Sequence, residues 1–99
     1  MDQLTSQQRK YLRGLANGLD AVVLVGKQGV TENLIQSVNT ALEAHELVKV
    51  RFNEFKDEKD ALIERIREAT QSHLAGRIGH VAILYRQQTD EKKRLIKLP

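Results

Sequence analysis

The chain has 99 residues, of which 40% are hydrophobic and 29% are charged, a balance typical of one folded domain and not of a disordered segment. It contains no cysteine, which excludes disulfides and thiolate metal sites. The sequence has neither an apolar run of the roughly 20 residues that span a bilayer nor the pattern of a signal peptide, so we expect a cytoplasmic protein without a membrane partner. The formal net charge of +3 is a small excess, which favours an acidic partner only where the cations cluster.

The first predicted element is a helix over about residues 6 to 17. Thr5 is a candidate N-cap, and Gln8 follows it at the spacing of a capping box, while Gly18 has the position of a C-terminal glycine. One arc of this helix contains no acidic residue and consists of Arg9, Lys10, Arg13 and Asn17. On its own this pattern favours a solvated surface, and a binding surface for a polyanion is the alternative.

The segment Gly26-Lys27-Gln28-Gly29 is the most informative part of the chain. It follows the apolar run 21–25, which predicts a strand buried on both faces, and it precedes a helix that Thr31 caps and that continues to about Ala44. Glycine has no Cβ to hold a ligand away, the helix start offers unpaired N–H groups, and Lys27 adds a charge. The spacing fits neither a P-loop nor a dinucleotide fingerprint. Two interpretations remain open: a structural turn, which is the commoner one, and a contact with phosphate.

The second half of the chain predicts three more strands and a further helix. Residues 47–52 alternate, so that Lys49 and Arg51 share the polar face of a half-buried strand. A helix of mixed charge follows over about residues 57–72. Strands at 74–78 and 81–85 are joined by Gly79-His80, which suits a type II′ turn. Residues 87–99 are expected to form an edge strand or a mobile tail.

The element order α-β-α-β-α-β-β predicts one α/β domain over residues 1–99, with a mixed four-stranded sheet and packed helices. The two uniformly apolar strands, 21–25 and 81–85, are expected in the middle of the sheet, with the alternating strands outside them.

The sequence offers no constellation of catalytic residues. The three histidines, His45, His73 and His80, fall in different connections or element ends, and none has a second ligand at a metal-binding spacing. The serines lack a nucleophile motif. We therefore expect no enzyme activity, no metal or other cofactor and no small-molecule substrate.

Four segments of the chain occur together in the order of one known family. They are Leu4-Thr5 with Gln8 to Arg13, Val25 to Thr31, Ala44 to Val50, and Ile78-Gly79-His80 with Leu84-Tyr85-Arg86. Together they closely resemble the CRM domain (chloroplast RNA splicing and ribosome maturation) in its small stand-alone bacterial form. The resemblance runs through about residues 4 to 86.

The resemblance implies an RNA-binding module, associated in bacteria with precursors of the large ribosomal subunit. It also implies a fold similar to the C-terminal domain of bacterial translation initiation factor three, and it likens the loop Gly26 to Gly29 to the KH loop that clamps a nucleic-acid backbone. The RNA surface implied near that loop maps to Arg9, Lys10 and Arg13, while Lys49 and Arg86 match recurrent family positions.

Aromatic residues make up only 4% of the chain, which argues against extensive base stacking, and Tyr11 and Tyr85 are expected in the core. The hypothesis from sequence is thus a non-enzymatic protein that binds structured ribosomal RNA through its phosphates, with the glycine loop and an adjacent basic helix. The alternative is a protein–protein adaptor that docks on a ribosomal protein or assembly enzyme through the same cations. Binding of a small ligand would require a pocket beside Gly26.

Overall fold

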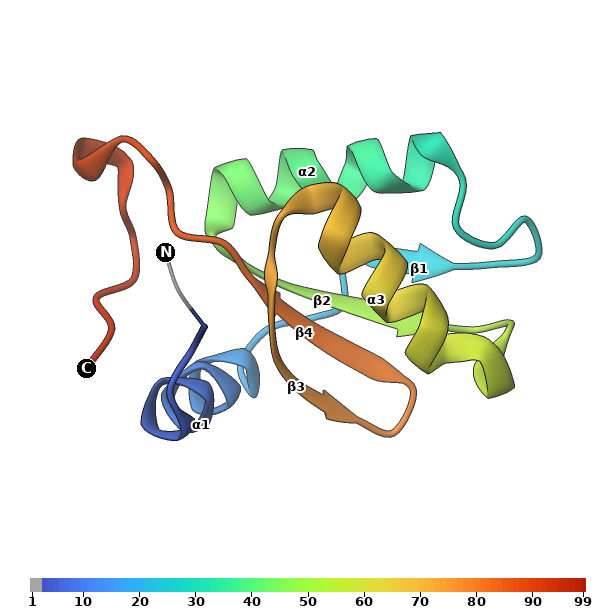
Figure 1. Cartoon of the computed structure of the whole chain (residues 1–99), viewed down its shortest axis with the longest axis horizontal. Helices are drawn as coiled ribbons and strands as arrows, with labels where there is room; N and C mark the ends of the chain where they lie inside the picture. The colour runs from blue at the N-terminus through green and yellow to red at the C-terminus, as the bar shows by residue number, and fades with distance from the viewer. Residues whose placement is uncertain (1–2) are drawn as a thin grey trace.

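The computed structural model describes residues 3–99 as three helices packed on the two faces of a four-stranded sheet (Figure 1). The elements are α1 (Ser6–Ala16), β1 (Val23–Val25), α2 (Glu32–His45), β2 (Leu47–Phe52), α3 (Lys59–Thr70), β3 (His73–Ile78) and β4 (Val81–Tyr85), with 3-10 turns at Lys56–Glu58 and Glu91–Lys93. The predicted order of helices and strands, and the mixed sheet, are confirmed.

The strands lie in the order β1-β2-β4-β3. β1 pairs with β2 in parallel, as expected of two strands linked through a helix, whereas β4 is antiparallel to both of its neighbours. β3 and β4 are joined by a two-residue hairpin turn. Gly79 has a φ of +59° and the φ of His80 is not positive, as a type II′ turn requires. The chain thus places β4 between β2 and β3.

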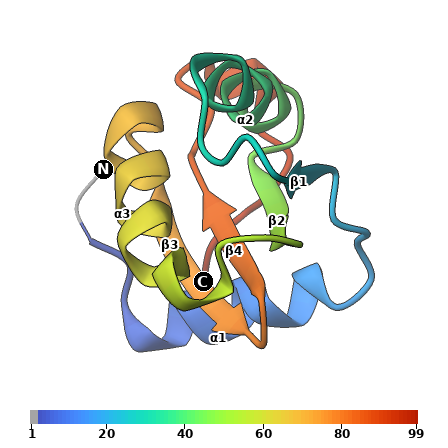
Figure 2. The ribbon, with the colours of Figure 1, turned by 90° about the vertical axis from the view of Figure 1, so that its right-hand side faces the viewer.

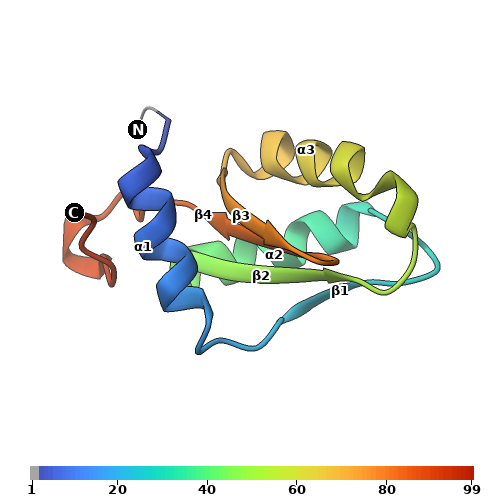
Figure 3. The same cartoon turned by 90° about the horizontal axis from the view of Figure 1, so that it is seen from below.

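Helices cover the two faces of the sheet unequally (Figure 2). α2 and α3 lie on one face, and their apolar side chains form the larger core with Val25, Val50 and Leu84. α1 lies on the other face, where Leu12 and Ala16 pack on Ala75, Ile83 and Tyr85. α1 crosses β2, β3 and β4 near one end of the sheet, so this second face is only partly covered (Figure 3).

The helix starts follow local sequence signals. Thr5 Oγ1 accepts from the N–H of Gln8 at 3.1 Å and Gln8 Oε1 accepts from the N–H of Thr5 at 3.0 Å, which confirms the capping box. Thr31 Oγ1 accepts from the N–H of Leu34 at 3.1 Å, which confirms the cap of α2. The expected glycine cap is wrong: the C-cap of α1 is Asn17 in a right-handed conformation, and Gly18 has no positive φ.

The prediction for residues 21–25 is also wrong. The strand has only three residues, it lies at the edge of the sheet, and Leu24 is 54% exposed between two buried valines. The alternating strand β2, expected outside, is a central strand instead. The reason is that α1 covers the other end of this face, so that Leu24 points to solvent although it is apolar.

A buried carboxylate holds the C-terminal segment. Glu46 is 1% exposed, and its two oxygens accept the N–H groups of Gln88 at 2.7 Å, Leu95 at 2.7 Å and Ile96 at 2.8 Å. Ile96 and Leu98 pack against the core under α1. Residues 95–98 form no strand, and the N–H groups of Leu95 and Ile96 bind this side chain and not a neighbouring strand.

Candidate nucleic-acid interface

The segment Gly26 to Gly29 is a β-turn at one end of the long axis of the molecule (Figure 1). The N–H of Gly29 donates to the carbonyl of Gly26 at 3.0 Å, so Lys27 and Gln28 are the two central, exposed residues. The N–H groups of Asn53 and Glu54 donate to the carbonyl of Val25 at 3.0 and 3.2 Å, which braces the turn from the β2–α3 connection.

The two glycines of the turn have different structural reasons. Gly29 has a φ of +72°, which favours glycine, and a Cβ there would lie 3.3 Å from Cε2 of Phe55, so the ring would have to shift slightly. Gly26 has no positive φ, and a Cβ there would meet no heavy atom within 4 Å. Nothing in the fold explains a glycine at position 26, and its backbone is open to a ligand.

Acidic as well as basic side chains lie beside the turn. It borders a hollow of about 730 Å³ that Lys27 and Lys56 share with three carboxylates, Glu54, Asp57 and Glu58. The start of α2 is also partly neutralised, because Thr31 caps it and Glu32 occupies its first turn. The β2–α3 connection brings these acidic residues beside the turn, which residue order alone does not indicate.

The basic arc of α1 is not near the turn, contrary to the expectation from the family resemblance. α1 lies towards the opposite end of the long axis and packs on β2, β3 and β4 (Figures 1 and 3). The cause is the apolar stripe of α1, which is buried against the face of the sheet that α2 and α3 do not cover. The turn and the helix therefore form two separate candidate surfaces.

The cations of α1 differ in their availability. The guanidinium of Arg9 donates to the carbonyl of Leu4 at 2.8 Å and to Ser6 Oγ at 3.1 Å. Arg13 donates to the carbonyl of Ala75 at 3.2 Å. The aliphatic part of the Arg13 side chain packs on Gly76, where an added Cβ would lie only 2.5 Å from Cδ of Arg13. Lys10 is exposed, and its ammonium has no hydrogen bond or ion pair within residues 3–99. Of the three, Lys10 is the one with all its donors available.

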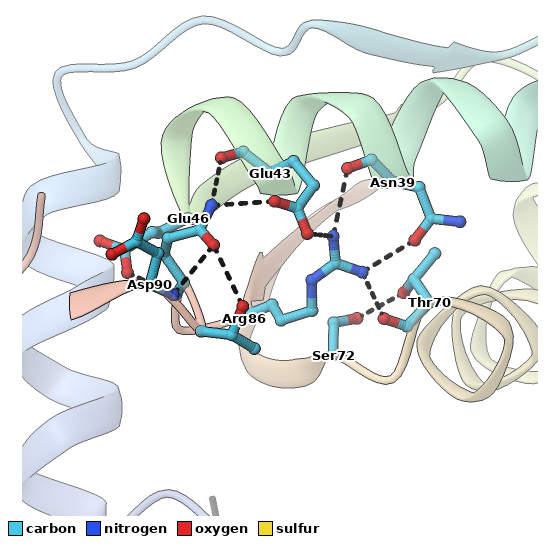
Figure 4. Close-up of polar contacts among 9 residues, drawn as sticks. Asn39, Glu43, Glu46, Thr70, Ser72, Arg86 and Asp90 are labelled. Atoms are coloured by element: carbon cyan, nitrogen blue, oxygen red, sulfur yellow. Dashed lines mark hydrogen bonds and ion pairs between the residues drawn. The ribbon is translucent and has the colours of Figure 1, made fainter. Parts of the chain in front are cut away.

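Lys49 and Arg86 also bind the protein itself. Lys49 Nζ donates to the carbonyl of Leu19 at 2.9 Å, which ties the α1–β1 connection to β2. The Arg86 guanidinium donates to Asn39 Oδ1 at 2.8 Å and to the carbonyl of Thr70 at 2.7 Å, and it forms an ion pair with Glu43 at 3.4 Å (Figure 4). It thereby joins α2 to the end of α3. Their contact with RNA stays a prediction, which these internal bonds do not favour.

Two further cations were not among the predicted site residues. Arg51 projects from β2 on the partly covered face, and Lys56 lies in the β2–α3 connection; both are exposed, and neither side chain has a polar partner in the described part of the chain. The alternation of residues 47–52 indicated the orientation of Arg51, whereas Lys56 lies in a connection without a pattern.

The tyrosines behave differently from each other. Tyr85 is buried as expected, its hydroxyl has no partner among residues 3–99, and burial raises its pKa to about 12. The expectation for Tyr11 is wrong, since it is 42% exposed on α1.

Within residues 3–99 no three side chains of the metal-binding types His, Cys, Asp and Glu gather into a possible site. No helix of the same range is long and apolar enough to cross a bilayer. The three histidines lie apart, in α2, β3 and the β3–β4 turn.

Comparison with known proteins identifies the family. The model of the CRS1 / YhbY (CRM) domain matches residues 4–86. An RNA-binding protein of Haemophilus influenzae is 34% identical over 96% of this chain and 97% of its own length, and the "Probable RNA-binding protein YqeI" of Bacillus subtilis is 35% identical over 97% and 99%. The solution structure of the hypothetical protein SAV1595 from Staphylococcus aureus superimposes with a TM-score of 0.79 at 39% identity, over 98% of this chain and 100% of that one. This chain belongs to the CRS1 / YhbY (CRM) domain family.

Proposed function

We propose that the protein is a non-enzymatic, cytoplasmic RNA-binding protein that recognises ribosomal RNA in precursors of the large ribosomal subunit. The observation that carries the proposal is the open backbone at Gly26, which lies in an exposed turn. It is joined by the relatives of the chain, which match it over nearly their whole length and are named as RNA-binding proteins or probable RNA-binding proteins. A glycine that the fold does not need is best explained by a ligand that approaches the main chain.

In this mechanism the turn is the point of close contact. A phosphate lies against the backbone at Gly26, the ammonium of Lys27 supplies charge, and Gln28 donates from its amide. Gly29 holds the turn in shape through its positive φ. Lys10 contributes a second, separate contact on α1, so that a folded RNA would have to reach both surfaces. Arg9, Arg13, Lys49 and Arg86 support these surfaces through the carbonyls that they bind.

The test is direct binding of the purified protein to ribosomal RNA, measured over a range of salt concentrations. Each phosphate contact with single-stranded RNA contributes about 0.7 to the slope of log K against log salt. Lys27→Gln should reduce the magnitude of that negative slope by about 0.7, because one phosphate contact is removed. An unchanged slope and affinity in the folded variant would contradict a phosphate contact at Lys27.

The adaptor hypothesis makes a different prediction for cell extracts. If RNA is the partner, association of the protein with large-subunit precursors should be lost after nuclease treatment. If an acidic protein is the partner, co-sedimentation with ribosomal proteins should survive the nuclease. Crosslinking to RNA followed by sequencing of the adducts then identifies the RNA segment that is bound.

A further inference from the structure

A second hollow lies at the same end of the molecule as the turn, between the end of β2 and the β3–β4 hairpin. It measures about 390 Å³, and its lining includes Arg51, Asn53, Lys56, Ile78, His80 and Val81. No carboxylate lines it, in contrast to the hollow beside the turn, where three do. Asn53 and Lys56 line both hollows, so the two are neighbours.

The strand register places the components of this hollow precisely. Arg51 lies opposite Val81 on β4, and Val81 lies opposite Ile78 on β3, so the three side chains project from the same face of the sheet. The N–H of Phe52 donates to the carbonyl of His80 at 2.8 Å, which fixes the hairpin to the end of β2. Ile78 is 57% exposed and gives the hollow an apolar edge beside the cations.

We propose that this hollow binds a second backbone phosphate of the RNA strand that contacts the Gly26–Gly29 turn. The proposal rests on the proposed function and deepens it, because it names a further point on the path of the bound strand. Arg51 offers a guanidinium fork and Lys56 an ammonium, both with donors that no protein group uses within residues 3–99. The apolar edge at Ile78 suits the sugar or base attached to that phosphate.

His80 supplies an internal reporter for the bound charge. Its pKa is lowered from 6.5, first by partial desolvation and then by the charges of Lys59, Lys56 and Arg77, against which Asp57 acts in the opposite direction. Asp60 in turn pairs with Arg77 at 3.1 Å. A phosphate in the hollow adds negative charge beside the imidazole, so the pKa of His80 should rise when RNA binds.

The experiment compares two pairs of charge-removing substitutions in the full chain. The double variant Arg51→Gln with Lys56→Gln removes the arginine and the lysine that line the hollow. The control is Arg65→Gln with Lys93→Gln, two exposed side chains without a polar partner in residues 3–99, on the outer face of α3 and in the Glu91–Lys93 turn. The probe is a labelled single-stranded RNA of about 12 nucleotides, a length within the usual range of site sizes.

The hollow variant should bind this probe roughly tenfold more weakly than the control variant, the effect of one lost charge-assisted hydrogen bond. The magnitude of its slope of log K against log salt should be smaller by about 0.7. In the unmodified protein, an NMR titration of His80 should show a higher pKa with RNA bound than without. This last measurement needs no substitution, so it holds even if a variant folds poorly.

Equal losses in the two double variants would refute the hollow, since only diffuse attraction would remain. If Gly26→Ala weakens binding while the hollow variant matches its control and the pKa of His80 does not rise, the hollow fails and the proposed function stands. If the unmodified protein binds neither this probe nor ribosomal RNA, the proposed function fails, and the second phosphate site fails with it.

Discussion

Replacing Gly26 by alanine separates the structural reason for a glycine from the functional one. At position 26 a Cβ would enter open space, and the backbone has no positive φ. Alanine should therefore leave the fold intact and raise the free energy of unfolding by about 0.4–1 kcal/mol, because it restricts the unfolded chain. For a domain of this size, 1 kcal/mol corresponds to roughly 4–8 °C in melting temperature.

The same substitution at Gly29 should have the opposite effect on stability. The φ of +72° costs a residue with a Cβ about 1–2 kcal/mol, and the ring of Phe55 at 3.3 Å would also have to move. Gly29→Ala should thus lower the free energy of unfolding by at least that amount, as urea denaturation would measure. A loss of RNA binding in this variant would say little about contact, because the turn itself changes.

RNA affinity should respond at Gly26 without a loss of stability. If a phosphate accepts a hydrogen bond from the main chain there, a methyl group in its path removes a charge-assisted bond of about 1.5–3 kcal/mol, or roughly tenfold to a hundredfold in affinity. Gly18→Ala is the matched control, since a Cβ at position 18 would meet only the carbonyl of Leu15 at an ordinary 3.9 Å. Fluorescence anisotropy at one fixed salt concentration measures all three variants. If Gly26→Ala and Gly18→Ala both bind RNA like the unmodified protein, the close approach at Gly26 is refuted.

Three further predictions concern the polar groups inside the fold. Arg86→Met should lower the free energy of unfolding by roughly 1–3 kcal/mol, because the carbonyl of buried Thr70 loses its donor; a decrease in RNA affinity at full stability would instead assign Arg86 to the RNA. Glu46→Gln should also lower the free energy of unfolding by roughly 1–3 kcal/mol, because the amide has one acceptor oxygen for three N–H groups. Proteolysis of residues 89–98 should become faster, and an unchanged rate would contradict the role of this carboxylate. Tyr85→Phe should leave stability at pH 7 equal or higher, since the hydroxyl has no partner in residues 3–99. Because the pKa of Tyr85 is about 12 in the folded chain and 10.0 ordinarily, the unfolded chain releases its proton first, and stability should fall from pH 10 to 12 more steeply than in the phenylalanine variant, as pH-dependent denaturation would show.

Local signals in the sequence predicted the elements whose causes are local. The capping box at Thr5, the cap at Thr31 and the two-residue hairpin at Gly79 each depend on residues within a few positions, and all three formed as expected. The edge position of β1 depends instead on which part of the sheet α1 covers, a long-range property. An apolar run therefore suggested a central strand where Leu24 is exposed.

The candidate site was predictable to the same extent. The turn at Gly26 to Gly29 was found because its residues are contiguous, and the structure adds the difference between its two glycines. The neighbouring carboxylates and the distant position of α1 follow from tertiary packing, so no spacing in the sequence indicated them. Lys56 was not predicted for the same reason, because only the fold brings it to the hollow that Arg51 also lines.

Positive charge in a sequence measures neither accessible charge nor available donors, and this difference governs how binding data on this protein should be interpreted. Arg13 and Arg86 each hold a backbone carbonyl of another element, so neutralising them changes the fold as well as the charge. Lys27 and Arg51 have no such bond within residues 3–99, so neutralising them changes the charge alone. A scan of all cations by RNA affinity would therefore rank the two arginines of the fold beside true contacts. Measured in the same buffer, the free energy of unfolding should fall in the Arg13 and Arg86 variants and stay unchanged in the Lys27 and Arg51 variants, so the two measurements together separate a structural cation from an RNA contact.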